Sequence, residues 1–177
     1  MTMKIISGNV IPAVTGGVFD FTTVTETPSN TILNSPAYIL ASYLIENGIA
    51  DVTHPDSNDD WPLFVSRTPN KPTNCCVIYD TTPNKDLRYM SGQVIEHYGL
   101  QMKVRSNSHI EGWVKLETLN KMIDEINNDV IIVNDIEYLI QNVSRNSGVI
   151  SLGAEEDAPE RRLFTSNYLM TLRNYLI

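Results

Sequence analysis

The stretch from Trp61 to Arg105 constrains the fold of this chain more than any other part of the sequence. Proline interrupts helices and central strands because it lacks a backbone donor, and prolines recur up to and within this stretch at Pro55, Pro62, Pro69 and Pro72. The apolar run Cys75–Thr81 then predicts a buried strand, and Val94–Val104 predicts a second one. We therefore expect two sheet strands that follow an irregular, proline-rich loop.

Two segments have the pattern of helices. Ser35-Pro36 is typical of a helix start, with a serine N-cap and a proline in the first turn, and Asn47-Gly48 predicts the end of this helix. In Glu111–Asn128, apolar residues recur at helical spacing, at Trp113, Leu116, Leu119, Ile123 and Ile126. We expect Leu116, Leu119, Ile123 and Ile126 to face the core, and Lys115, Glu117 and Lys121 to face outward or toward a neighbour.

The remaining apolar runs predict further strands. Leu63–Val65 is a short candidate, and the second half of the chain offers Val130–Val133, Ile136–Val143, Val149–Leu152 and Phe164–Leu172. The acidic segment Gly153–Glu160 reads as a loop between the last two. Together these patterns predict an α+β fold, a mostly antiparallel sheet with two helices packed on it, over residues 34–177.

Residues 1–33 differ from the rest of the chain. They are rich in Thr, Val and Gly, carry few charges and show no helix signal. We interpret them as a β-rich N-terminal arm. Unpaired strand edges promote aggregation unless they find a partner. We therefore expect the arm to add strands to a sheet edge, on its own subunit or on a neighbouring one.

Composition excludes several classes of protein. The net charge of −8 removes the main driving force for non-specific DNA binding, although DNA could still slide through a pore made by such a chain. The longest apolar runs are too short to span a bilayer, and the N-terminus lacks the apolar core of a signal peptide. Cys75 and Cys76 are strand neighbours that point to opposite faces, so we expect buried thiols in a reducing compartment.

The residues give little support for a metal or catalytic site. Asp56, Asn58 and Asp60 have the spacing of a calcium loop, but Trp61 stands where that loop needs glycine and Arg67 where it needs glutamate. The three histidines, His54, His97 and His109, have no metal-ligand spacing. We therefore expect no catalytic residues, no metal and no cofactor, and interpret the chain as a non-enzymatic protein.

The order of motifs from Ser35 to Leu172 resembles that of the tail terminator family of tailed bacteriophages, also called tail completion or minor capsid proteins. The resemblance covers roughly four-fifths of the chain. It is carried by the helix 35–48, Trp61-Pro62-Leu63-Phe64-Val65, the turn Pro69–Pro72, Tyr79-Asp80-Thr81, the loop Arg88–Gly92, the strand His97–Arg105, a long helix, a hairpin, Leu152-Gly153 and Arg162–Tyr168. Members that begin near the first helix would lack residues 1–33.

This resemblance implies a structural virion protein, made in the host cytoplasm, that forms a hexameric ring on the head-proximal end of the tail tube. Its expected partners are further copies of itself, the tail tube protein and a connector or stopper protein; genomic DNA would pass through the lumen without specific binding, and no membrane is involved. As interface residues we expect Trp61, Pro62, Arg88, Tyr89, Arg105, Arg161 and Arg162. The alternatives are a head–tail connector or stopper, and, from another class, a small ligand-binding or enzymatic α+β domain.

Overall fold

A computed structural model describes the backbone of residues 2–6, 9–13, 20–22, 32–57, 61–85 and 96–175, and the side chains of residues 32–57, 61–84 and 97–172. The chain divides into two compact units, Met1–Thr31 and Ile32–Ile177. This division falls two residues before the boundary expected from the sequence, because Ile32 packs against the core of the second unit.

The first unit contains three short strands, β1 (Thr2–Ile6), β2 (Asn9–Ala13) and β3 (Asp20–Thr22). They form a sheet of their own in the order β2-β1-β3, in which β2 is antiparallel and β3 parallel to β1. These strands therefore have partners in one another, whereas the sequence predicted their addition to another sheet edge. Strands so near in sequence need only short connections, and closing a short connection costs little entropy. Addition to a neighbouring subunit stays a prediction.

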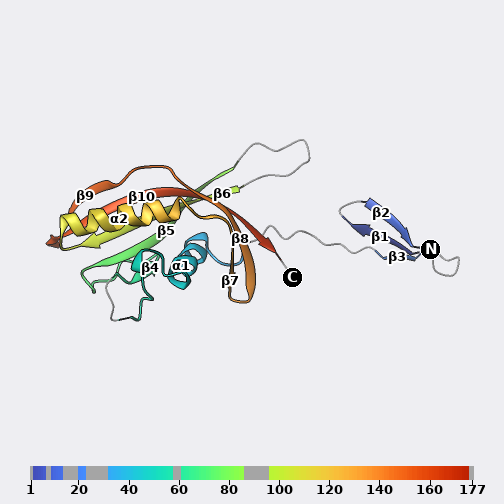
Figure 1. Ribbon diagram of the computed structural model, residues 1–177, viewed down its shortest axis with the longest axis horizontal. Helices are drawn as coiled ribbons and strands as arrows, with labels where there is room; N and C mark the ends of the chain where they lie inside the picture. Colours follow the sequence, from blue (N-terminus) through green and yellow to red (C-terminus); the bar gives the residue numbers. More distant parts are fainter. Residues whose placement is uncertain are drawn as a thin grey trace. The chain divides into compact units, whose positions relative to one another are not determined.

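The second unit has an α+β fold, as the sequence predicted, with two α-helices on a mostly antiparallel sheet (Figure 1). Its elements are α1 (Pro36–Glu46), the 3-10 turn η1 (Ile49–Asp51), β4 (Leu63–Val65), β5 (Cys75–Lys85), β6 (Glu96–Ser106), α2 (His109–Ile123), β7 (Asn127–Val133), β8 (Ile136–Arg145), β9 (Ile150–Glu155) and β10 (Ala158–Tyr175). The strand order is β4-β5-β6-β10-β8-β7, with β9 also paired to β10. Only β4 and β5 run parallel among the strand pairs described in this unit.

The main core lies between the helices and one face of the sheet. Strand residues alternate between the two faces, so Leu100, Met102 and Val104 of β6 all point to the helix side. They pack with apolar residues of both helices in one cluster. The opposite face holds a smaller buried cluster of Phe64, Cys75 and Val77.

Helix α1 begins where local capping predicts it. The Tyr38 N–H donates to the Ser35 hydroxyl at 3.2 Å, and the Ala37 N–H donates to the Asp80 carboxylate of β5 at 2.9 Å. A carboxylate beside a helix N-terminus accepts a hydrogen bond from a backbone N–H that has no partner within the helix. Its negative charge also interacts favourably with the positive end of the helix dipole. Asp80 therefore ties the first turn of α1 to the second strand of the sheet.

We expect Asp80→Ala to lower the free energy of unfolding by about 1 kcal/mol, because the Ala37 N–H loses a charged capping partner. Urea unfolding followed by circular dichroism measures this change. The matched control is Glu156→Ala, which removes an exposed carboxylate from a turn and should change stability by less than about 0.5 kcal/mol. Equal stability of the two variants would contradict the capping role.

The boundaries of α2 differ from the prediction of Glu111–Asn128. The helix starts earlier, since the Ser108 hydroxyl accepts a hydrogen bond from the Glu111 N–H at 3.3 Å, and it ends at Ile123. The chain then turns at Asp124-Glu125, where the Ile126 N–H donates to the Ile123 carbonyl at 3.1 Å, and β7 begins at Asn127. Gly112 lets α2 lie close to the sheet, since a Cβ there would stand 2.5 Å from the Phe164 ring.

The predicted core face of α2 is confirmed for Leu116, Leu119, Ile123 and Ile126, which are all buried. Trp113, the first residue of the apolar repeat, is 40% exposed and packs edge-on against Phe164. The expectation that Lys115 faces outward was wrong. Lys115 is half-buried and turned inward, because its ammonium group donates to the Ala50 carbonyl and lies over the Trp61 ring.

The end of the chain is more regular than predicted. The acidic segment expected to be a loop forms the end of β9 and the beginning of β10, with a tight turn at Glu156-Asp157. Arg161 and Arg162 thus lie in a strand and not in a loop. The long strand β10 can accommodate these charges because its first residues lie toward the outside of the unit, where most of residues 155–162 keep contact with solvent.

Candidate functional site

Trp61 and Pro62 make contacts inside the second unit, which link the proline-rich segment to α2 and β5. The Lys115 ammonium group stands 5.0 Å from the centre of the half-buried Trp61 ring, a cation–π contact. Pro62 is buried, and its carbonyl accepts a hydrogen bond from the Cys76 N–H at 2.9 Å. The sequence predicted interface positions for both residues, and in this subunit they make internal contacts.

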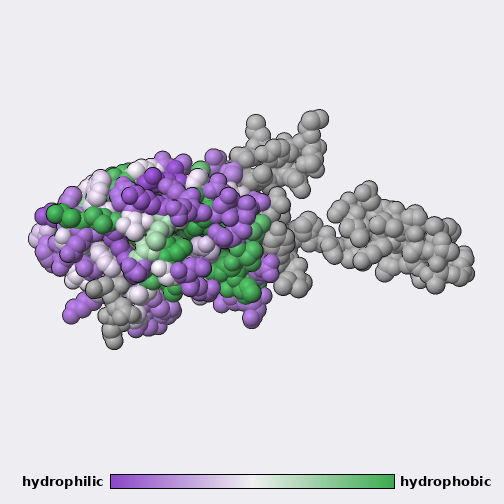
Figure 2. All heavy atoms as spheres, viewed as in Figure 1, coloured by the Kyte–Doolittle hydropathy of each residue, from purple (hydrophilic) through white to green (hydrophobic). Residues whose placement is uncertain are grey.

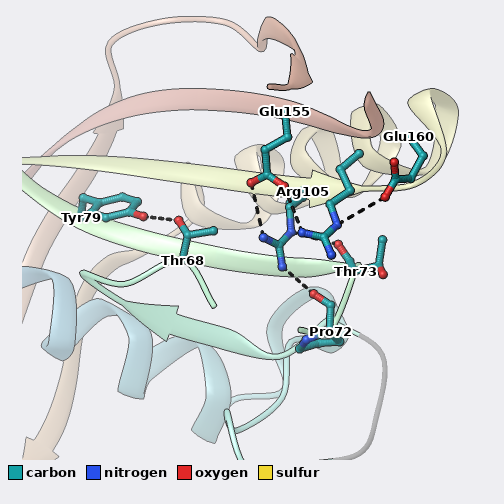
Figure 3. Close-up of polar contacts among 8 residues, drawn as sticks. Thr68, Pro72, Thr73, Tyr79, Arg105, Glu155 and Glu160 are labelled. Carbon is teal, nitrogen blue, oxygen red and sulfur yellow. Dashed lines mark hydrogen bonds and ion pairs between the residues drawn. The ribbon is translucent and has the colours of Figure 1, made fainter. Parts of the chain in front are cut away.

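The position of Arg105 differs most from the interface role expected from the sequence, because only 2% of its side chain is exposed. Its guanidinium donates to the Pro72 carbonyl at 2.6 Å, to the Thr73 carbonyl at 3.2 Å and to the Glu155 carboxylate at 3.4 Å. Figure 3 shows Arg105 reaching from β6 to the proline-containing loop on one side and to Glu155 on the other. An interface role for Arg105 is therefore wrong for this subunit, because the loop covers its side chain.

Arg161 belongs to the same group of charges. It lies 3.2 Å from the second oxygen of Glu155 and 3.9 Å from Glu160, so that the Glu155 carboxylate is shared by two arginines. These contacts hold the β9–β10 hairpin against the loop that precedes β5. On the hairpin side, the side chains of Arg161 and Glu155 keep some contact with solvent, with 21% and 24% of their surface exposed.

Arg162 is the predicted interface residue that stands at the surface. Its side chain is exposed, and the structure gives it no ion pair with any described residue. Its strand position is opposite Ser106, near the start of α2. The loop with Arg88 and Tyr89 lies outside the described residues, so the interface prediction for these two stays a prediction.

An open hollow of about 650 Å³ lies between α2 and the segment around η1. Its lining includes Asp51, Trp61, Glu111 and Lys115. The Lys115 ammonium group already has the Ala50 carbonyl and the Trp61 ring as partners. The other polar residues of the lining are Thr53, Asn74 and Thr118.

The cysteines are buried, as the sequence predicted. Burial raises the pKa of the Cys76 thiol to about 12 and also raises the pKa of the Cys75 thiol above its usual value. A thiol with a raised pKa is a poor nucleophile and metal ligand at neutral pH, because only the thiolate reacts. Both cysteines therefore act as core residues.

The histidines are dispersed. His97 shares a 2.7 Å hydrogen bond with Thr171, and His109 stacks beside Trp113. His54 is exposed in the segment after η1, 3.5 Å from Asp56. The described residues contain no group of three or more His, Cys, Asp or Glu side chains placed to hold a metal ion. The calcium spacing at Asp56 falls partly on Asn58 and Asp60, which lie outside the described residues.

The structure has two exposed apolar surfaces that the sequence did not predict. The α2 surface consists of Ile110, Trp113 and Val114, and the β7 surface consists of Val130 and Ile132. Figure 2 shows hydrophobic side chains over the β7–β8 hairpin and at the end of the unit where α2 begins. The sequence pattern marks these residues as apolar helix and strand positions, but it does not tell which of them the fold leaves uncovered.

No protein-family model matches this sequence, and no curated protein matches it either. None of the helices in the described part of the chain is both long enough and apolar enough to cross a membrane.

Proposed function

We propose that this chain is a structural virion protein of a tailed bacteriophage, a tail terminator. It forms a ring, with six copies as the family resemblance implies, on the head-proximal end of the tail tube. There it stops tube polymerisation and offers a surface to the connector or stopper protein. The observation that carries the proposal is the order of motifs from Ser35 to Leu172, and the α+β fold of the second unit is compatible with it.

The roles of the motif residues support a protein that works through its architecture. Asp80 caps α1, Trp61 lies under Lys115, and Arg105 fixes the loop at Pro72. Each of these polar or aromatic groups is engaged in holding elements of the subunit together. Side chains committed to internal contacts stabilise a rigid shape, which a ring subunit needs, and do not constitute a reaction centre.

The charge of the chain supports the same proposal. With a net charge of −8, a ring of these subunits has an acidic character that repels the DNA backbone. DNA that leaves the head must pass the terminator without being held. Weak contact with phosphates is therefore compatible with a conduit, whereas a DNA-packaging or DNA-binding protein would need basic patches.

Native mass spectrometry of the purified chain, alone and with tail tube protein, tests the proposal. We expect a closed oligomer and its binding to tube ends, visible by negative-stain electron microscopy, with tube growth arrested. A chain that remains monomeric and leaves tube growth unchanged contradicts the proposal. A ring that binds the connector but ignores tube ends supports the stopper alternative instead.

Charge reversal at Arg162 should weaken assembly and leave the subunit folded, because this arginine is exposed and keeps no ion pair within the described residues. We expect Arg162→Glu to weaken association about three- to tenfold, the range of a surface charge pair made repulsive. Sedimentation velocity over a concentration series measures the shift. The matched control is Arg67→Glu, at an exposed arginine in the loop before β5. Equal association of both variants with the wild type would sink the interface role of Arg162.

Deleting residues 1–31 tests the function of the first unit. Ile32 and Asn34 stay in the shortened chain because Ile32 packs on the core and the Asn34 amide donates to the Tyr138 hydroxyl at 2.9 Å. We expect this chain to fold with unchanged thermal stability but to lose either ring formation or tube binding. Full rings that still cap tubes would show that the first unit has neither function.

A further inference from the structure

The α2 surface and the hollow beside η1 are parts of one continuous area. Val114 lines both the hollow and the shallow recess formed with Ile110 and Trp113. Val114 is 55%, Ile110 75% and Trp113 40% exposed, although the other side of the same helix is buried. Adjacent exposed apolar residues with a tryptophan among them are typical of contact sites between proteins. We call this area, made of the α2 surface and the lining of the hollow, the α2–η1 face.

The rim of the hollow is held in an unusual backbone conformation. Ala50, Asp51 and Trp61 all line the hollow and all have a left-handed φ, of 51°, 48° and 66°. Such a φ is unfavourable for residues other than glycine and persists only where the surrounding structure imposes it. Here the Thr53 N–H donates to the Trp61 carbonyl at 3.3 Å, and the Leu63 N–H donates to the Thr53 carbonyl at 2.9 Å. Backbone pairing therefore fixes the shape of the hollow in advance.

Most polar side chains of the hollow are engaged within the unit. The Lys115 ammonium group and the Thr118 hydroxyl both donate to backbone carbonyls, and the Asn74 side-chain oxygen accepts a backbone N–H. The Thr53 hydroxyl oxygen is buried and does not reach solvent. What the hollow offers to another molecule is therefore set mainly by its remaining polar side chains.

Those remaining side chains are the carboxylates of Asp51 and Glu111. Both residues are exposed, and neither carboxylate has a hydrogen bond or an ion pair with any residue that the structure describes. An ionised carboxylate only accepts hydrogen bonds, and its strongest partners are donors that carry a positive charge. The unused binding capacity of the hollow therefore matches an ammonium or guanidinium group.

The sequence beside the hollow is acidic as well. Residues 51–60, which begin in the lining, contain four aspartates and no lysine or arginine. Lys115 is the one cation of the described lining, and Lys71 and Arg162 lie outside it. Carboxylates in a hollow attract a cationic group and repel an acidic one. Charge complementarity therefore selects a basic occupant for the polar part of the α2–η1 face.

We infer that the α2–η1 face binds a segment of a partner protein in which a lysine or arginine stands beside apolar side chains. The cationic side chain enters the hollow and pairs with Asp51 and Glu111, and the apolar side chains cover Ile110, Trp113 and Val114. Burial of the apolar residues supplies affinity, and the carboxylates select the cation. This contact requires no ring and is independent of whether the chain caps a tail tube.

The chain has its own fluorescent reporters for this contact. Its two tryptophans, Trp61 and Trp113, both belong to the α2–η1 face. The probes are short peptides from a random library, selected for binding to the full-length protein. Titration of each selected peptide, followed by tryptophan fluorescence, then measures its affinity for this face.

Three substitutions separate the hollow from the apolar part. Asp51→Asn and Glu111→Gln remove the negative charges and keep the side-chain shape, and asparagine tolerates the left-handed φ at position 51. Ile110→Ser removes exposed apolar surface. The controls are Asp135→Asn, at an exposed aspartate with a left-handed φ of 62° in the β7–β8 turn, and Leu152→Ser, at a leucine 54% exposed on β9. Circular dichroism and thermal unfolding confirm that each variant is folded.

We expect the selected peptides to share a lysine or arginine next to apolar residues. The double variant Asp51→Asn/Glu111→Gln should bind them about tenfold more weakly or worse, because the cation loses both charged partners. Ile110→Ser should weaken binding about three- to tenfold, and the two controls should stay within about twofold of the wild type. Added salt should weaken binding to the wild type more than to the double variant.

Other outcomes overturn the inference. They are a selection that enriches no peptide, enriched peptides that lack a basic residue, and peptides that leave the tryptophan fluorescence unchanged. Equal binding to the double variant and the wild type also refutes the role of the hollow. Wild-type rings that dissociate in the double variant assign the face to a second copy instead. A wild-type chain that stays monomeric contradicts the proposed function and leaves this contact standing.

Discussion

Leu119→Ala should lower the free energy of unfolding by about 2–5 kcal/mol, the largest loss that we expect from a single apolar truncation in this protein. Leu119 is fully buried at the centre of α2 and belongs to the main core between the helices and the sheet. Truncation removes apolar contacts and leaves a cavity that a close-packed interior fills only partly. Urea unfolding of the two proteins measures the difference.

The control for this variant is Lys121→Ala on the same helix. Lys121 is exposed, so its truncation should change stability by less than about 0.5 kcal/mol. If Leu119→Ala and Lys121→Ala unfold at the same urea concentration, the buried face of α2 has been assigned to the wrong residues.

Arg105→Ala should destabilise the subunit by about 2–4 kcal/mol, because it removes a buried charge together with its hydrogen bonds to two backbone carbonyls. Glu155 keeps Arg161 as a partner, so the loss should stay below that of a fully broken buried ion pair. Beyond the global loss, the loop at Pro72 should open first. Faster proteolysis of the segment 66–74 in the variant measures this local effect.

Arg105→Lys distinguishes the shape of the guanidinium from its charge. A lysine ammonium group cannot reproduce the planar fork that reaches Pro72, Thr73 and Glu155 together, so we expect an intermediate loss of stability. Arg67→Ala, at an exposed arginine of the same loop, serves as the control. Arg105→Ala with the stability of this control would be incompatible with a structural Arg105.

The starts of the two helices show what a local sequence pattern can predict. The start of α1 was predictable from Ser35-Pro36, because an N-cap and a first-turn proline act within one turn of chain. The start of α2 lies two residues before the predicted one, because the Ser108 N-cap precedes the first residue of the apolar repeat, Trp113, by more than a turn. Tyr168 and Ser166 also form a buried network with Asn120, a polar residue inside the apolar stripe that periodicity does not predict.

The candidate sites were less predictable than the helices. Arg105, Arg161 and Arg162 are all basic residues of strands, yet Arg105 is buried, Arg161 is paired with Glu155, and Arg162 is exposed. No local property of the sequence distinguishes the burial of these three arginines. The difference arises because the loop before β5 and the β9–β10 hairpin cover Arg105 and Arg161 from opposite sides.

The sequence by itself determined the α+β class, the two helices of the described residues, the core face of α2 and the strand character of residues 75–81, 130–133 and 136–143, because side-chain periodicity and capping act over a few residues. The tertiary structure alone decided that β4 runs parallel to β5, that Arg105 is enclosed, and that Ile110, Val114, Val130 and Ile132 stay exposed. Each of these depends on which distant segment covers a given residue. Apolar character is a property of one side chain, whereas burial is a property of its neighbours in the fold.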